Sequence, residues 1–374
     1  MDISGLQEEL KAVKTKEPYC GYKYKLLDVL TIAILGTLCG LRNMAMIIKW
    51  ANSMPVRMML VKRFQIGIIP KYVQFTNILG NIDPKKLNEA FIRWASAMVQ
   101  DVEGLTIAID GKAIRSTTLH IVSAYATELG LTLGQVAVDY KKNEIPATQE
   151  LLDLIDIHGA IVVADALNCQ KKTAKKIVKN GGDYLLSVKK NHKNLHEDIE
   201  TYFQNPPQKL EKAQTLEKNS GRIEKRTAYT SCDVDWLLQN EKGEKLTTIG
   251  AIHTEFEIGN KKTSEWHYYI SSAYLTPKHL LKHAREEWGI ETMHYMLDVH
   301  FDEDRCKVQD KNTHQTLNIF RKIALNLLKE YKNQSESKKP LSNIMAECLF
   351  DCNVLANFVL SRDFFVAVFG LLQN

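Results

Sequence analysis

The sequence lacks the cysteine pattern of a disulfide-bonded or zinc-binding protein. Its seven cysteines are an odd number, and no two of them form a Cys-X-X-Cys pair. Cys348 and Cys352 have the spacing of one helical face, but no nearby His or Cys completes a zinc site. We therefore predict small, buried thiols in a reducing cytoplasm.

The sequence also has no long hydrophobic run and no internal repeat. The most apolar stretch, residues 29–41, is shorter than the ~18 residues that a membrane-spanning helix needs. The start, Met1-Asp2-Ile3, has no basic region of the kind that precedes the core of a secretory signal. We expect a cytoplasmic protein that has no membrane partner.

The composition is that of an ordinary globular protein, but its charge is unevenly distributed. With 45% hydrophobic and 25% charged residues, a chain of 374 residues can fold into roughly two or three domains with packed cores. Residues 1–100 hold 14 Lys and Arg against 7 Asp and Glu, so the basic charge is concentrated there. Such a surface either meets phosphates or is a solvated helical face, and charge alone does not separate the two.

Residues 1–100 have the pattern of a small helical domain. Apolar-rich segments at 26–41 and 44–51 are separated by Gly40, and Asp83-Pro84 is a typical start of a helix. Four basic residues of this region are candidates for contacts with phosphates: Arg42, Lys62, Arg63 and Lys71.

From Gly104 the pattern becomes that of a mixed α/β sheet flanked by helices. Three strand-like runs are followed by alternating helices and strands, an order typical of such a sheet. The strands are expected at residues 105–109, 121–127, 131–138, 160–164 and 184–188. Asn205-Pro206-Pro207 interrupts this pattern. We predict a core that begins with residues 101–204, a β-rich insertion over 205–271 and a helical remainder over 272–374.

Two aspartates directly follow predicted strands. Asp110 follows residues 105–109 and Asp165 follows residues 160–164, the place where α/β sheets expose functional side chains. An ionised carboxylate there is costly without a partner, and a divalent cation is one such partner. The pair Asp110-Gly111 is also common in simple turns, so a structural role stays open at this point.

A third carboxylate is expected on a helix near the C-terminal end of the core. The segment 285–294 predicts a helix on which Glu291, His294 and Asp298 share one face. The acidic cluster at 302–304 competes with Glu291 as a metal ligand, and periodicity does not decide between them.

Taken together, these residues resemble the H-repeat-associated insertion-sequence transposases. The matching segments are Ile107-Ala108-Ile109-Asp110-Gly111-Lys112 with Arg115, Val122-Ser123-Ala124, Leu133-Gly134-Gln135, Asn143-Glu144-Ile145, Ala164-Asp165-Ala166-Leu167-Asn168-Cys169-Gln170, Asp183-Tyr184-Leu185-Leu186 and Lys189-Lys190-Asn191. The most specific signature is Trp288-Gly289-Ile290-Glu291, then His294, Leu297-Asp298-Val299, Phe301 and Glu303-Asp304-Arg305. The likeness spans essentially the whole chain.

The resemblance implies a DDE transposase with a ribonuclease H-like catalytic domain, interrupted by an insertion. Asp110, Asp165 and Glu291 would be its catalytic residues and its metal ligands. The implied cofactor is Mg²⁺, for which Mn²⁺ can substitute, and two ions roughly 3.5–4 Å apart would serve phosphodiester chemistry. Asp110 would bridge both ions. The expected activities are cleavage at the ends of the element and transfer of the freed 3′ ends to target DNA.

The partners implied by the resemblance are the element's terminal repeats and target DNA. The residues expected to contact DNA are Lys112, Arg115, Lys171, Lys172, Lys189, Lys190, Asn191, Arg222, Arg285 and His294. The 1–100 region would be the DNA-binding domain. A homodimer on DNA is expected because two element ends must be held together, and the expected location is the bacterial nucleoid within the cytoplasm. Trp288 is interpreted as a core residue that locks the catalytic helix.

Departures from the family pattern are minor and concern the handling of the leaving strand and the phosphates, not the metal site. Lys190 and His192 replace the usual Gly and Gln around Asn191, and Asp298 stands near a position where related transposases carry Lys. The main alternative is a catalytically silent or host-recruited remnant that acts as a DNA-binding protein. A different ribonuclease H-like nuclease, such as a junction resolvase, and a non-catalytic structural protein are further alternatives. The intact triad weighs against the remnant, and the insertion weighs against the other nuclease.

Overall fold

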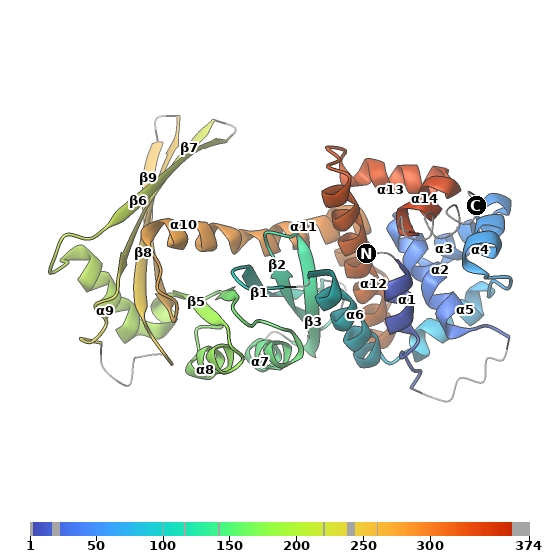
Figure 1. Cartoon of the computed structure of the whole chain (residues 1–374), viewed down its shortest axis with the longest axis horizontal. Helices are drawn as coiled ribbons and strands as arrows, with labels where there is room; N and C mark the ends of the chain where they lie inside the picture. The colour runs from blue at the N-terminus through green and yellow to red at the C-terminus, as the bar shows by residue number, and fades with distance from the viewer. Residues whose placement is uncertain are drawn as a thin grey trace, which may run out of the picture.

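A computed structural model of the chain shows an elongated molecule with a helical part at one end and a sheet that runs to the other (Figure 1). The structure describes residues 3–16, 23–99, 101–115, 117–140, 143–219, 221–237, 244–259 and 261–360. Cys20, Gln100 and residues 361–374 therefore lie outside the described residues. Among the helices that are described, none is both long enough and apolar enough to cross a membrane.

Six helices precede the sheet, as the pattern of residues 1–100 predicts. They are α1 (Ile3–Leu10), α2 (Leu26–Leu38), α3 (Met44–Ala51), α4 (Met54–Phe64), α5 (Tyr72–Asn81) and α6 (Pro84–Val99). At the start of α6, the Asp83 carboxylate accepts the N–H of Lys85, which confirms the predicted helix start. Helix α2 is buried along almost its whole length, as its apolar sequence requires.

Three C-terminal helices complete the core of this helical part. They are α12 (Lys311–Gln334), α13 (Leu341–Phe350) and α14 (Cys352–Val359). Phe320 of α12 is buried in the same hydrophobic cluster as Leu30 of α2 and Phe91 of α6. The N-terminal helices therefore share one core with α12, α13 and α14, and both α6 and α12 pack against β3 of the sheet.

The centre of the molecule is a five-stranded mixed sheet. Its strands are β1 (Thr106–Ala113), β2 (Leu119–Ala126), β3 (Leu131–Asp139), β4 (Ile161–Ala164) and β5 (Asp183–Val188), in the order β3-β2-β1-β4-β5. β1 pairs antiparallel with β2 and parallel with β4, and β4 pairs parallel with β5. This is the ribonuclease H-like arrangement. The flanking helices are α7 (Glu144–Leu154), α8 (Lys171–Lys179) and α9 (Lys193–Gln204), the last preceded by the short helix η2 (Lys190–His192).

The insertion continues the central sheet instead of forming a sheet of its own. Its strands are β6 (Lys212–Asn219), β7 (Arg222–Ser231), β8 (Thr248–Ile258) and β9 (Lys261–Ser271), all antiparallel. β9 pairs with β5, so the nine strands form one sheet. The β-rich character of this segment is confirmed.

Two consecutive helices connect the insertion with the helical part. α10 (Pro277–Glu286) and α11 (Trp288–Phe301) follow one another across the sheet (Figure 1), and the short helix η3 (Glu303–Arg305) leads into α12. α11 packs against β1 and β2. Residues of α11 are thereby brought next to β1, which lies far from them in the sequence.

The cysteines remain free thiols in the described part of the chain. Cys39, Cys169, Cys306 and Cys348 are buried, as predicted, whereas Cys232 is exposed.

Candidate active site

The three predicted acidic residues line one cavity. Asp110 lies within β1 and Asp165 directly follows β4. Ile109 pairs with Ala164 in the parallel β1–β4 ladder, so each aspartate comes directly after one member of this pair. Glu291 lies in the first turn of α11, which packs on β1. All three line a cavity of about 390 Å³. The sheet and α11 thus bring together side chains separated by 181 residues of sequence.

Carboxylates and basic side chains both line the cavity, and Asp110, Asp165 and Glu291 repel one another there. Burial and the charges of Glu144, Asp165 and Glu291 together raise the pKa of Asp110 to about 6, against the opposing hydrogen bond from the Gly111 N–H. Carboxylate oxygens are the ligands that Mg²⁺ and Mn²⁺ prefer, so this donor set fits a divalent cation.

The geometry does not fit a single cation bound to all three carboxylates. Among the described residues, the one group of three potential ligands whose atoms lie within 4.8 Å of one another is Glu128, His283 and Glu286. The triad is outside that limit, whereas oxygens bound to one Mg²⁺ at about 2.1 Å lie at most about 4.2 Å apart. The Glu128 group lies at the start of β1, where the Thr106 hydroxyl and Lys282 satisfy its charges.

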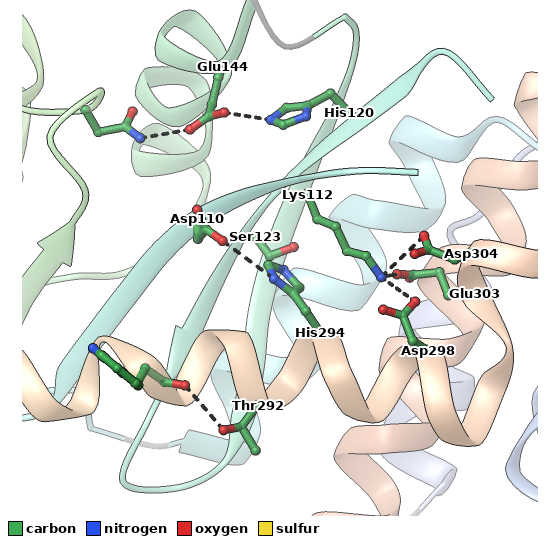
Figure 2. A network of polar contacts seen from close by, with 12 residues as sticks. Asp110, Lys112, His120, Ser123, Glu144, Thr292, His294, Asp298, Glu303 and Asp304 are labelled. Atoms are coloured by element: carbon green, nitrogen blue, oxygen red, sulfur yellow. Dashed lines mark hydrogen bonds and ion pairs between the residues drawn. The ribbon is translucent and has the colours of Figure 1, made fainter. Parts of the chain in front are cut away.

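A buried chain of side chains orients Asp165. Its Oδ1 accepts the backbone N–H groups of Leu167 and Asn168 and the side-chain amide of Asn168, at 3.1, 3.2 and 3.1 Å. The same amide nitrogen donates to Glu144 at 3.1 Å, and Glu144 is 2.7 Å from His120 Nε2 (Figure 2). Sequence reasoning assigned no role to His120, Glu144 or Asn168, although the last two lie inside the matching motifs.

Comparison with known proteins identifies the family. Residues 102–327 match the family model described as Transposase DDE domain, and residues 9–95 match the model of its associated region. The chain belongs to the DDE transposase family. The matched DDE domain contains all three acidic residues and the β-rich insertion.

The relatives place this transposase in the H-repeat-associated group. The H repeat-associated putative transposase YhhI of Escherichia coli is 32% identical over 377 residues, which cover 96% of this chain and 98% of that protein. The putative transposase YncI of Escherichia coli O157:H7 is 30% identical over 353 residues, 89% of each chain. Among solved structures, the piggyBac transposase synaptic complex with hairpin DNA aligns with a TM-score of 0.43 and 10% identity, covering 100% of this chain and 81% of that one.

The turn interpretation of Asp110-Gly111 is wrong. In the transposase β1 continues to Ala113, so Gly111 is a strand residue. A Cβ at Gly111 would lie 2.3 Å from His120 Nε2 and 2.7 Å from Glu144 Oε2. Glycine is needed here because the His120–Glu144 pair packs against the backbone beside Asp110.

Gly111→Ala is therefore expected to destabilise the transposase by about 1–3 kcal/mol through overpacking. The matched control is Gly67→Ala, where an added methyl group meets nothing within 4 Å. It should change stability by less than about 0.5 kcal/mol. Urea unfolding followed by circular dichroism measures both variants. An unchanged midpoint for Gly111→Ala would mean that His120 and Glu144 move aside at no cost.

A fourth carboxylate, Glu287, lines the same cavity. It lies one helical turn before Glu291, at the junction of α10 and α11. Burial and the charge of Asp165 raise the pKa of Glu287 to about 7, while Lys189 opposes the shift. The four-residue spacing from Glu291 is the sequence signal that could have identified it.

Two residues predicted to contact DNA are half-buried and turned toward other protein side chains instead. The Lys112 side chain is 15% exposed, and its ammonium lies 2.8 Å from Glu303 and 3.6 Å from Asp304 (Figure 2). His294 is 12% exposed and its Nδ1 lies 3.6 Å from Asp110 Oδ2. Burial, together with the charge of Lys322, lowers the pKa of His294 to about 3. The structure does not place either side chain on a DNA-facing surface.

The acidic cluster at 302–304 is not a second metal site. Glu303 is buried and bound by Lys112, and Arg115, which is 85% exposed, lies 3.3 Å from Asp304. Lys112 and Arg115 therefore neutralise the cluster, and only Glu291 of the two candidates reaches the cavity.

Three predicted DNA-contacting residues do line the cavity: Lys189, Arg222 and Arg285. The Arg222 guanidinium lies 4.2 Å from the centre of the Phe256 ring, and that of Arg285 lies 5.5 Å from the centre of the Trp288 ring. Trp288 is 54% exposed, so its interpretation as a core residue is wrong. Its indole belongs to the rim of the cavity.

The remaining predicted contacts lie elsewhere. Lys171 and Lys172 line a separate cavity of about 500 Å³ together with Cys169 and His192. Lys190 and Asn191 are exposed, and the Asn191 amide donates to the Ala166 carbonyl oxygen at 2.8 Å. This hydrogen bond links Asn191, in the short helix η2, to the loop that follows Asp165.

Proposed function

We propose that this transposase cuts DNA at the ends of its element and joins the freed 3′ ends to target DNA with the help of two divalent metal ions. The observation that carries the proposal is the convergence of Asp110, Asp165 and Glu291 on one cavity, where burial and mutual repulsion raise the pKa of Asp110.

The residues of the site would have different roles in holding the metal ions. Mg²⁺ or Mn²⁺, when bound, would supply Lewis-acid activation of the nucleophile and charge stabilisation at the leaving 3′-oxygen. Asp110, Asp165 and Glu291 would hold the ions. Asn168 and the N–H groups of residues 167 and 168 keep Asp165 Oδ1 in place. Two ions need more oxygen ligands than three carboxylates supply, and Glu287 is placed to add one.

DNA would be held by basic side chains on the rim of the cavity and by the helical part. Lys189, Arg222 and Arg285 stand beside the carboxylates, where they can contact the phosphates that flank the scissile bond. The basic excess of residues 1–100 supports a role of the N-terminal helices in binding terminal repeats. A dimer on DNA would bring two element ends together in the bacterial cytoplasm, at the nucleoid.

The direct test is incubation of the purified protein with supercoiled DNA that carries the element's own ends. We expect cleavage at those ends with Mg²⁺ or Mn²⁺ and none in the presence of a chelator. Binding to the ends without cleavage under any metal would favour the DNA-binding remnant. Cleavage of branched DNA that ignores the ends would favour a different ribonuclease H-like nuclease.

A further inference from the structure

The side of Asp110 that faces away from solvent is covered by a polar layer that the triad does not explain. Asp110 pairs with Ser123 on β2, and Ser123 pairs with Gln135 on β3, so the three residues form one row across three strands. Cross-strand partners point to the same face of a sheet. Two helices contribute side chains to this row: His294 from α11 and Lys322 from α12.

His294 stands directly against the carboxylate of Asp110 (Figure 2). Its Nδ1 lies 3.6 Å from Asp110 Oδ2, and its Nε2 is buried with no hydrogen-bond partner among the described residues. A carboxylate only accepts hydrogen bonds, so the tautomer with its hydrogen on Nδ1 is the one that can donate to Asp110. Such contacts are often long without substrate and shorten in the reacting complex.

The layer behind His294 is buried and hydrogen-bonded. Lys322 is fully buried, and its ammonium donates to Ser123 Oγ and Gln135 Oε1, both at 2.6 Å. These two bonds hold the β2 and β3 members of the row in place. The imidazole is therefore confined between α11 and the row, with Asp110 as the one acceptor that its Nδ1 contacts among the described residues.

We propose that His294 is a positioning residue that donates its Nδ1–H to Asp110 Oδ2 and so sets the orientation in which Asp110 Oδ1 meets the metal. The inference rests on the proposed metal-dependent function. Partners that hydrogen-bond to metal-ligating groups from behind fix their geometry, and their loss weakens metal affinity by about 10–100-fold. His294 would act through Asp110 and would touch neither metal nor DNA.

Three substitutions in the full-length protein separate positioning from packing. The amide nitrogen of Asn can occupy the position of Nδ1, whereas that of Gln reaches the position of Nε2 and Leu has no donor. We expect His294→Asn to bind Mn²⁺ within about 3-fold of the wild type. His294→Gln and His294→Leu should each bind it about 10–100-fold more weakly. Calorimetric titration with Mn²⁺ alone measures the affinities, and thermal unfolding without metal checks the fold.

The outcomes separate this inference from the function it rests on. If the wild type binds Mn²⁺ and Asp110→Asn abolishes this binding, the proposed metal site is supported. The Mn²⁺ affinities of the three His294 variants are then compared with that of the wild type. Equal weakening in all three folded variants, or none in His294→Leu, would overturn the positioning role while the metal site stands. Absence of any Asp110-dependent Mn²⁺ binding in the wild type would overturn both.

Discussion

Asp110→Asn is expected to abolish DNA cleavage, by at least about 10³-fold, and at the same time to raise the thermal stability of the metal-free transposase. The loss follows from removing a negative charge on which the metal ions depend, worth several kcal/mol of transition-state stabilisation. The gain follows from relieving a buried charge, because burial and neighbouring carboxylates raise the pKa of Asp110 to about 6.

The sign of the pH dependence distinguishes this gain from a general stabilisation. An Asp whose pKa is raised on folding from 3.8 to about 6 takes up its proton in the folded state first, so the wild type gains stability as pH falls through 6. The advantage of Asp110→Asn should be present above about pH 7, at about 2–4 °C in the unfolding midpoint, and should disappear near pH 4. Calorimetry at the two pH values measures it. A lower midpoint for the variant at pH 8 would contradict the buried-charge account.

The fold was largely accessible from periodicity, and its departures have identifiable causes. The apolar run at 105–109 predicts β1 only as far as Asp110, because Asp, Gly and Lys are poor strand formers. The strand continues to Ala113 because its neighbour β2 pairs with Asp110, Gly111, Lys112 and Ala113 in turn. Likewise, no local pattern predicts that β9 pairs with β5, because the paired residues lie between 80 and 86 positions apart in the sequence.

The residues of the candidate site that lie at strand ends were predictable from the sequence. The side chains that reach the site through the packing of distant segments were not. Asp110 and Asp165 follow apolar runs that the sequence shows directly, and Glu291 lies on a helix with a clear acidic face. By contrast, the neighbours of Lys112 and His294 come from distant segments, Glu303 in the first case and Asp110 in the second. A motif match includes Lys112 and His294 in the family pattern. It does not tell whether their side chains face DNA or contact carboxylates inside the protein.

Glu291→Gln and Glu303→Gln are expected to have opposite effects, which decides between the two acidic candidates that periodicity left open. Glu291→Gln should reduce cleavage by at least about 10²-fold with little change in stability, because Glu291 is exposed and lines the cavity proposed to hold the metal ions. Glu303→Gln should destabilise the fold by roughly 3 kcal/mol, because Glu303 is buried and neutralises the half-buried Lys112.

Both variants are measured by urea unfolding and by cleavage of element-end DNA at a temperature at which each is folded. Glu303→Gln should then cleave within about 10-fold of the wild type, because Lys112 keeps Asp298 and Asp304 as partners and the cavity carboxylates are untouched. The reverse result, a stable but inactive Glu303→Gln beside an active Glu291→Gln, would assign the third ligand to the cluster at 302–304. That result would also require α11 to rotate so that a different face packs against β1. The burial of Met293 and Leu297 in the hydrophobic core opposes such a rotation.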